Sequence, residues 1–211
     1  MISMLLLAAA AMTPTAVDAE RAFARDSQRI GQWSAFRRYA DPDAVMFTPQ
    51  AVWAHEFLKD RKDPPRSLRW SPSESFVSCD GRTAVNSGPW ASANGKSNGY
   101  FTTVWQRDKG RWLWVYDGGD DLAAPRARRT QPRVRRASCR GTPKAPPMFA
   151  MPPAVKRVRT GPPADAGRGL SADRTLAWVW RVEGKGARQF RTFLWNGSHY
   201  EQVLYNQTSG T

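Results

Sequence analysis

The chain has 211 residues, of which 41% are hydrophobic and ten are tryptophan, a composition typical of a globular protein. It contains no run of about 18 apolar residues, so we expect no transmembrane segment. The net charge of +14 arises almost entirely from residues 122–164, which carry 11 basic and no acidic side chains, whereas residues 20–121 carry 15 and 13. The charge therefore marks one segment, and it argues against a specific nucleic-acid partner.

Residues 1–19 have the pattern of a secretory signal peptide. The apolar run LLLAAAAM has the right length, and Val17 and Ala19 place small residues at positions −3 and −1 of a cleavage site. No Lys or Arg precedes Arg21, so the usual basic start is missing, and a helix that begins early is the alternative. The pattern favours export to a periplasmic or secreted location, with a mature chain that begins at Glu20.

The first folded segment after the signal is predicted to be helical. Apolar residues at helical spacing predict a helix over residues 20–39, in two pieces with a break at Gly31. The tripeptide DPD at residues 41–43 ends it, because the residue before a proline disfavours the α conformation. Residues 44–47 then predict a short strand, and residues 51–59 predict another amphipathic helix.

The next segment is rich in β-branched and aromatic residues. Residues 67–79 and 83–90 predict two strands joined by a tight turn at an Asp-Gly pair. Residues 99–121 predict a hairpin, because two strand-like runs flank the polar tetrapeptide RDKG. Neither face of this hairpin is polar enough for open water, so we expect it to form the covered centre of a sheet.

Strict alternation of side chains predicts the two faces of this hairpin. On its returning strand, alternation places Trp112, Trp114 and Tyr116 on one face and Leu113, Val115 and Asp117 on the other.

The order of these elements predicts an α+β fold with helices to one side of a curved antiparallel sheet. The segments AERAFARDSQRIGQWSAFRRYADPDAVMF and GYFTTVWQRDKGRWLWVYDGGD resemble the nuclear transport factor 2-like superfamily, in particular its SnoaL-like and ketosteroid-isomerase-like bacterial branches. The shared motifs are a helix ending in Asp-Pro-Asp before a short strand and a last strand of the form Gly-Arg-Trp-Leu-Trp. This resemblance covers residues 20–121, and it implies a cone-shaped sheet wrapped around the N-terminal helices, with a pocket at the open end.

The catalytic branches of that superfamily commonly use a pocket carboxylate or a His–Asp pair as general acid or base. Burial in an apolar pocket raises the pKa of a carboxyl towards neutrality, and the hairpin's basic groups lie about 20 Å from Asp117 along the strand. The resemblance therefore implies Asp117, His55 and Asp43 as candidate catalytic residues. Each has an alternative: a strand exit for Asp117, a solvent-facing helix position for His55 and turn hydrogen bonding for Asp43.

Aromatic side chains with a few polar groups are the usual lining of a pocket for small apolar ligands. The residues expected near the mouth of the cone are Trp33, Phe36, Tyr39, Phe47, Trp53, Trp90, Tyr100 and Trp105. For any one of them, core packing is the alternative. The expected partner is a small apolar or aromatic molecule. The sequence shows no metal signature and no Gly-rich phosphate loop, so no metal or cofactor is expected.

Residues 122–164 hold nine of the sixteen prolines, and we expect them to form an extended or disordered linker with a short edge strand at 134–139. Residues 165–211 then predict a C-terminal β-meander with strands at 175–182, 189–195 and 200–205. Three strands alone are marginal in water. The meander should therefore pack on the first block or on a second copy of the chain, which leaves a homodimer open.

An exported protein with two cysteines can form a disulfide, and a bond between Cys79 and Cys139 would staple the linker to the sheet. Two free thiols are the alternative. Three functions follow from the sequence. The first is an exported protein that binds a small molecule without catalysis. The second is an isomerase or cyclase with Asp117 or His55 as base, and the third is an envelope protein that binds anionic surfaces through its basic linker.

Overall fold

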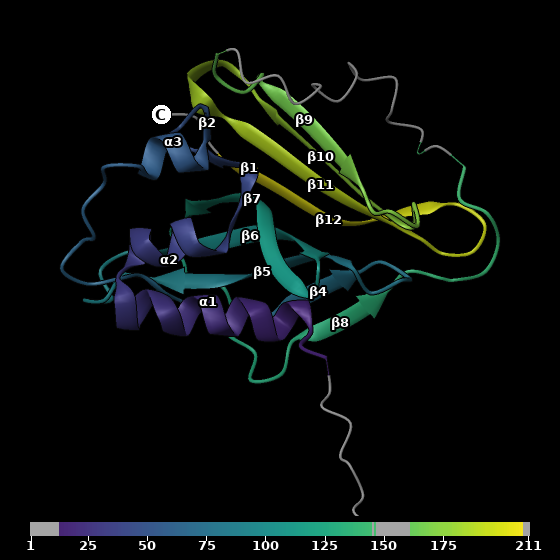
Figure 1. Ribbon diagram of the computed structural model, residues 1–211, viewed down its shortest axis with the longest axis horizontal. Coiled ribbons are helices and arrows are strands. Elements are labelled where there is room, and N and C mark those ends of the chain that lie inside the picture. Colours follow the sequence, from purple (N-terminus) through teal and green to yellow (C-terminus); the bar gives the residue numbers. More distant parts are fainter. Residues whose placement is uncertain (1–12, 145, 147–160, 209–211) are drawn as a thin grey trace, which may run out of the picture.

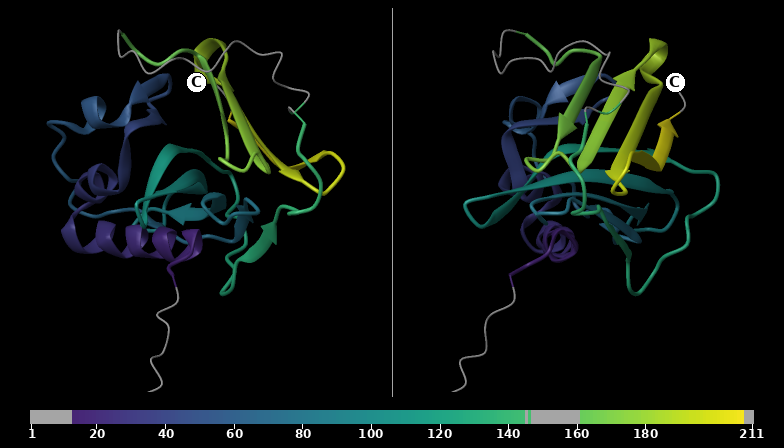
Figure 2. Two further views of the ribbon diagram at one scale, coloured as in Figure 1. Left: turned by 45° about the vertical axis from the view of Figure 1, so that its right-hand side comes forward. Right: turned by 90° about the vertical axis from the view of Figure 1, so that its right-hand side faces the viewer.

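The computed structural model of the protein describes residues 13–144, 146 and 161–208. A curved eight-stranded sheet lies between the helices on one side and a four-stranded C-terminal sheet on the other (Figure 1, Figure 2). The expected α+β class is confirmed. Most of the expected signal peptide, residues 1–12, and part of the expected linker, residues 147–160, lie outside the described residues.

The two-piece N-terminal helix is present. It consists of α1 (Ala16–Ile30) and α2 (Gln32–Tyr39), and Gly31 joins them with a φ of +100°, a conformation that glycine adopts readily. Thr15 caps α1 through a capping box with Asp18. Helix α1 therefore begins before residue 20, where the sequence analysis placed its start. Among the described residues, none of the helices is both long and apolar enough to cross a membrane.

The first turn of α1 is part of the core. Ala16 and Ala19 are buried, Trp112 donates its indole N–H to the carbonyl of Pro14 at 2.8 Å, and Asn86 donates to the carbonyl of Ala16 at 2.9 Å. Cleavage directly after Ala19 would remove the helix cap and all of these contacts.

The eight-stranded sheet has the strand order β2, β1, β7, β6, β5, β4, β8, with β3 paired to β5. Its strands are β1 (Ala40–Phe47), β2 (Ala51–Trp53), β3 (Arg69–Trp70), β4 (Glu74–Val77), β5 (Thr83–Ala91), β6 (Asn98–Asp108), β7 (Arg111–Asp121) and β8 (Arg133–Arg136). The pairs β1–β7 and β4–β8 are parallel, so the sheet is mixed and not antiparallel throughout.

The expected helix at residues 51–59 is shorter in the structure. Its first three residues pair with β1 as strand β2, and only α3 (Ala54–Leu58) is helical. The apolar side chains of this segment fit either state, and the ladder to β1 decides in favour of the strand.

The β6–β7 hairpin lies at the centre of the sheet, as predicted. Its turn residues Lys109 and Gly110 have φ values of +46° and +82°, the two positive values that suit a two-residue hairpin turn. Apolar clusters cover both faces, because Val104 packs towards the C-terminal sheet and Trp105 packs towards the helices.

A β-bulge at Val115 changes the faces of β7. Trp105 pairs with Trp114, but the preceding residue of β6 pairs with Tyr116, so Val115 has no partner of its own. Beyond this extra residue Tyr116 faces the C-terminal sheet, and Asp117 shares the helix-facing side with Trp114. The prediction that Tyr116 shares a face with Trp114 is therefore wrong, because strict alternation does not account for a bulge.

The C-terminal sheet has one strand more than expected. It contains β9 (Ala166–Leu170), β10 (Leu176–Val182), β11 (Arg188–Trp195) and β12 (Tyr200–Thr208). In β9, a Cβ atom on Gly167 or Gly169 would lie 2.5 or 1.9 Å from the indole of Trp180 or Trp178, respectively. The strand carries glycine at these positions because the tryptophan rings of β10 lie over its backbone.

The C-terminal sheet packs on the eight-stranded sheet of the same chain (Figure 2). Val85, Val104 and Tyr116 from one sheet share a buried apolar cluster with Trp178 and Phe190 from the other. Of the two packing partners considered for the meander, the structure shows the first block.

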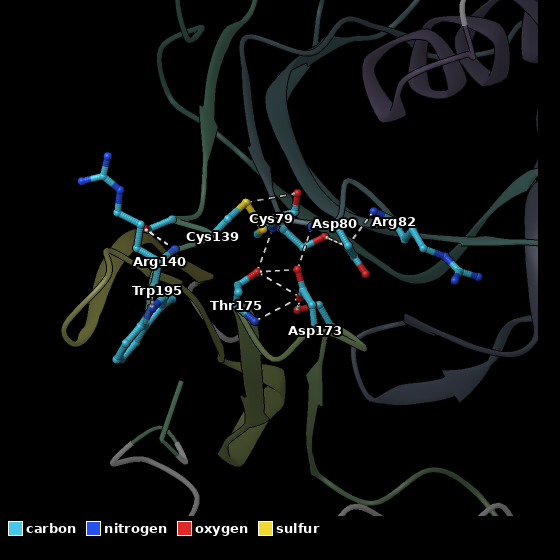
Figure 3. Close-up of a disulfide and its surroundings, with 11 residues drawn as sticks. Cys79, Asp80, Arg82, Cys139, Arg140, Asp173, Thr175 and Trp195 are labelled. Atoms are coloured by element: carbon cyan, nitrogen blue, oxygen red, sulfur yellow. Dashed lines mark hydrogen bonds between the residues drawn. A yellow bond between two sulfur atoms is a disulfide. The ribbon is translucent and has the colours of Figure 1, made fainter. Parts of the chain in front are cut away.

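The two sheets are also joined at one end, beside a disulfide between Cys79 and Cys139 (Figure 3). The Cα atoms of these cysteines lie 5.2 Å apart. Thr175 accepts a hydrogen bond from the Cys79 N–H at 2.8 Å, and Asp173 accepts one from the Asp80 N–H at 2.7 Å. This end of the C-terminal sheet is therefore fixed to the turn between β4 and β5.

Candidate binding site

A cavity of about 340 Å³ opens between α1, α2 and the helix-facing side of the eight-stranded sheet. We call it the aromatic cavity. Six aromatic residues line it: Phe23, Phe36, Trp70, Trp90, Tyr100 and Phe101. The Tyr100 side chain itself points to the C-terminal sheet, where its hydroxyl donates to the carbonyl of Gln207 at 3.1 Å. Residues 117–121, the last residues of β7, form its polar end.

Helix and strand positions bring these rings together. Phe23 lies on the buried stripe of α1, and its ring centroid is 4.8 Å from that of Phe36 on α2 and 4.9 Å from that of Trp70 on β3. Trp70 and Trp90 are cross-strand partners. The Trp90 indole lies over Gly99, where a Cβ atom would come within 2.5 Å of it. Gly99 thus leaves room for one wall of the cavity.

Asp117 is the polar group at the inner end of the aromatic cavity. It is half-buried, and its carboxylate accepts a hydrogen bond from the hydroxyl of its cross-strand partner Thr103 at 3.0 Å. Burial and, to a smaller extent, the nearby charge of Glu20 raise the pKa of Asp117 to about 7. The carboxyl therefore gains or loses its proton near neutral pH.

Glu20 is a second buried carboxyl, directly behind this end of the cavity. It is fully buried and accepts hydrogen bonds from the indole N–H groups of Trp105 at 2.6 Å and Trp70 at 2.9 Å, and from the amide of Asn86 at 3.3 Å. Burial raises its pKa to about 7 in spite of these hydrogen bonds. Asp117 and Glu20 together form a coupled acidic pair.

The sequence analysis did not identify Glu20, although the signal was present. Ala16, Glu20, Phe23 and Ser27 share one stripe of α1, and all four are buried. A glutamate within an apolar helical stripe indicates a buried, hydrogen-bonded acid. The residue was instead interpreted as the first one after a cleavage site.

Tyr116 is the last residue of β7 that pairs with β1, and a second cavity of about 250 Å³ lies next to the residues that follow it. This cavity shares residues 117–120 with the aromatic cavity. Arg188 of β11 lines it. This side chain is only 6% exposed, lies 4.0 Å over the ring of Phe47 and donates to the carbonyl of Gly119 at 2.8 Å. The C-terminal sheet thus brings a cation near Asp117 that the hairpin itself does not contain. Its charge lowers the pKa of Asp117, but burial outweighs it.

The aromatic residues predicted for the pocket separate into three groups. Those that border the aromatic cavity are Phe36, Trp90 and Tyr100, and Phe47 borders the second cavity. Those that border neither cavity are Trp33, Tyr39, Trp53 and Trp105. Trp33 contacts Phe36, Tyr39 donates to Asp26, Trp53 donates to the carbonyl of Gly161, and Trp105 is fully buried. The sequence did not identify Phe23, Trp70 or Phe101, whose inward positions depend on packing between distant segments.

Of the three candidate catalytic residues, Asp117 lines the two cavities described above, and His55 and Asp43 line neither of them. His55 lies on α3 with its Nε2 atom 3.4 Å from the carbonyl of Ala40. Asp43 lies in β1, where its backbone N–H donates to the carboxylate of Asp41 at 3.0 Å, and it borders neither cavity. Within the described residues, no group of three or more His, Cys, Asp or Glu side chains is arranged to hold a metal ion.

No protein-family model and no curated protein matches the chain. Solved structures do match it. An NTF-2-like protein of unknown function from Shewanella oneidensis MR-1 is 16% identical with a TM-score of 0.40, covering 48% of this chain and 93% of its own. A protein of unknown function from the DUF3225 family of Pectobacterium atrosepticum SCRI1043 is 13% identical with a TM-score of 0.39, covering 53% and 94%. Each of these similarities covers about half of this chain.

Proposed function

We propose that this protein binds a small, largely apolar or aromatic molecule in the aromatic cavity. The observation that carries the proposal is a cavity of about 340 Å³ lined by six aromatic residues, with one half-buried carboxyl, Asp117, at its inner end. Small-molecule sites are concave and mostly apolar, and they contain a few polar groups that fix the orientation of the ligand. Asp117 is suited to that role, because its proton lets it donate as well as accept.

Calorimetric titration with 2-naphthol, a neutral aromatic probe, tests this proposal. The wild-type protein should bind it saturably, and Trp90→Ala should weaken binding about tenfold, because it removes one aromatic wall. Trp33→Ala is the matched control, since Trp33 is also a half-buried tryptophan but lies outside the cavity. Absence of binding, or equal weakening by both substitutions, would contradict the proposal. If the probe binds as expected, mass spectrometry of a co-purified ligand would identify the natural molecule.

A second candidate function is acid–base catalysis on the bound molecule, as in an isomerase or cyclase. The observation that favours it is the pair of Asp117 and Glu20, each with a pKa raised to about 7 by burial. A general base is most effective when its pKa lies near the working pH. Asp117→Asn should then keep the fold and ligand binding but abolish turnover. If Asp117 only ends a strand, the same substitution should change neither binding nor melting temperature by much.

We further propose that the protein is exported. The disulfide between Cys79 and Cys139 supports this, because such bonds persist in oxidising compartments. The alternative function, binding of anionic surfaces through the basic linker, has less support. Arg126 and Arg135 of the linker are already engaged within the chain, by Asn206 and Glu201 respectively.

A further inference from the structure

We infer that the ligand of the aromatic cavity carries a positive charge, as an alkylammonium or quaternary ammonium group held between the aromatic walls and Asp117. This inference rests on the proposed function, because it assigns the chemistry of the ligand in the same cavity.

The lining of the aromatic cavity is acidic, although the protein as a whole is strongly basic. Among the described residues, the charged side chains that line it are Asp117, Asp120 and Asp121, with no Lys, Arg or His. The chain as a whole has a net charge of +14. Asp117 forms no salt bridge in the part of the chain that the structure describes, and its one hydrogen bond there comes from the neutral hydroxyl of Thr103. Among the described residues, no cationic side chain is therefore in salt-bridge contact with this carboxyl.

The two arginines nearest to this end of β7 are directed to the other side of the sheet. Arg126 stacks 4.1 Å over the ring of Tyr100 and donates to Asn206 of the C-terminal sheet. Arg188 stacks on Phe47 and lines the second cavity. Neither arginine lines the aromatic cavity. The protein's own cations therefore leave the helix-facing side of Asp117 open to a ligand.

The aromatic walls suit a cation as well as an apolar group. The face of an aromatic ring carries partial negative charge, and tryptophan attracts cations most strongly. Two tryptophans, Trp70 and Trp90, line the cavity, and the indole N–H of Trp70 donates to the buried carboxyl of Glu20. A hydrogen bond to an acid polarises that indole towards more negative charge on its ring. The ring faces of the walls and the carboxyl at the end of the cavity thus both contribute a negative electrostatic potential, which attracts a cation.

Asp117 also makes the inference testable through pH. Its pKa of about 7 means that the carboxyl is largely neutral below this pH and largely ionised above it. The charged groups that face it are Glu20 from α1, which ionises in the same range, and Arg188 from β11. Because Glu20 gains negative charge together with Asp117, a permanent cation should bind more tightly as the pH rises through 7.

Three probes of nearly equal shape separate charge from size: choline, its neutral isostere 3,3-dimethyl-1-butanol and the anion 3,3-dimethylbutanoate. Calorimetric titration of the full chain at pH 8 should show choline binding about tenfold more tightly than the alcohol, with the anion weakest. At pH 6 the affinity for choline should fall several-fold and that for the alcohol should not change. The alcohol or the anion binding as tightly as choline would overturn the inference.

Asp117→Asn should remove both the preference for choline and its dependence on pH, whereas Asp108→Asn, at the hairpin turn, should change neither. If the Asp117 variant does not fold, the pH dependence of the wild-type protein decides. If 2-naphthol binds and choline does not, the inference is wrong while the proposed function stands. If neither binds, both are wrong.

Discussion

The two faces of the eight-stranded sheet differ in what they bury. The helix-facing side holds the buried carboxyl of Glu20 and the half-buried carboxyl of Asp117, and it contains the aromatic cavity. The side under the C-terminal sheet buries an apolar cluster that includes Val104, Tyr116 and Trp180, and the space beside Tyr116 measures only about 10 Å³. The same strands build both faces, so the difference arises from alternate residues. It indicates that one face serves as a binding site and the other as core.

A single extra residue contributes to this division. Without the bulge at Val115, strict alternation would point Asp117 towards the C-terminal sheet and away from the helices. The bulge turns its carboxyl to Thr103 and the aromatic cavity. A bulge near a site that redirects one side chain is a common use of this irregularity.

The largest loss of stability should come from a substitution on the core face, the side of the eight-stranded sheet that lies under the C-terminal sheet. Trp180 is 7% exposed, contacts the rings of Phe47 and Tyr116 and lies over Gly167, so Trp180→Ala should lower the free energy of unfolding by about 3–5 kcal/mol. Urea unfolding followed by circular dichroism measures this. Tyr205→Ala is the control, because Tyr205 is 44% exposed and its loss should cost less than about 1 kcal/mol. Similar losses for both would contradict the assignment of this face as core.

The sequence predicts the regular parts of this fold but not its irregular ones. The break at Gly31 and the hairpin around Lys109 follow from local periodicity and turn chemistry, which a single sequence contains. The bulge at Val115 and strand β9 do not follow from it. The bulge is a shift in the register between β6 and β7 that their alternating composition does not reveal, and tryptophan rings on a neighbouring strand explain the glycines of β9.

The candidate site was predictable only in part, for the same reason. Asp117 was recognised because it ends a strongly predicted strand. Phe23, Trp70 and Phe101 were not, since a cavity wall depends on how α1 and β3 pack against β6. Arg188 reaches this end of β7 from a strand far along the chain, which no local pattern indicates.

An intermediate loss of stability should result from removing the first turn of α1, which packs on the helix-facing side of the sheet. A chain that begins at Glu20 lacks the Thr15 cap and the hydrogen bonds to the carbonyls of Pro14 and Ala16, so it should lose about 2–3 kcal/mol relative to a chain that begins at Thr13. Urea unfolding of the two chains measures the difference. For the same reason, intact-mass measurement of protein from its own host should show a start before Pro14. Equal stability, together with a mature start at Glu20, would support cleavage after Ala19 instead.

The smallest effect should be a dependence of stability on pH, caused by the two carboxyls on the helix-facing side of the sheet, Glu20 and Asp117. The pKa values of Glu20 and Asp117 rise from ordinary values of 4.5 and 3.8 to about 7 in the folded protein. Between these limits the unfolded chain releases protons that the folded chain retains, so the contribution of both groups to stability is complete at low pH and is lost as the pH rises through 7. The free energy of unfolding should therefore be higher at pH 6 than at pH 8, by on the order of 2 kcal/mol.

Glu20→Gln should reduce that difference by about 1 kcal/mol, because one of the two buried acids no longer ionises and the other loses a neighbouring charge. Glu56→Gln, on the exposed side of α3, is the control and should leave the difference unchanged. Urea unfolding at the two pH values measures both variants. A wild-type protein that is more stable at pH 8 than at pH 6 would mean that these carboxyls are ionised in the fold. In that case the helix-facing side would contain a cation that pairs with them, and its electrostatic contrast with the core face would be lost.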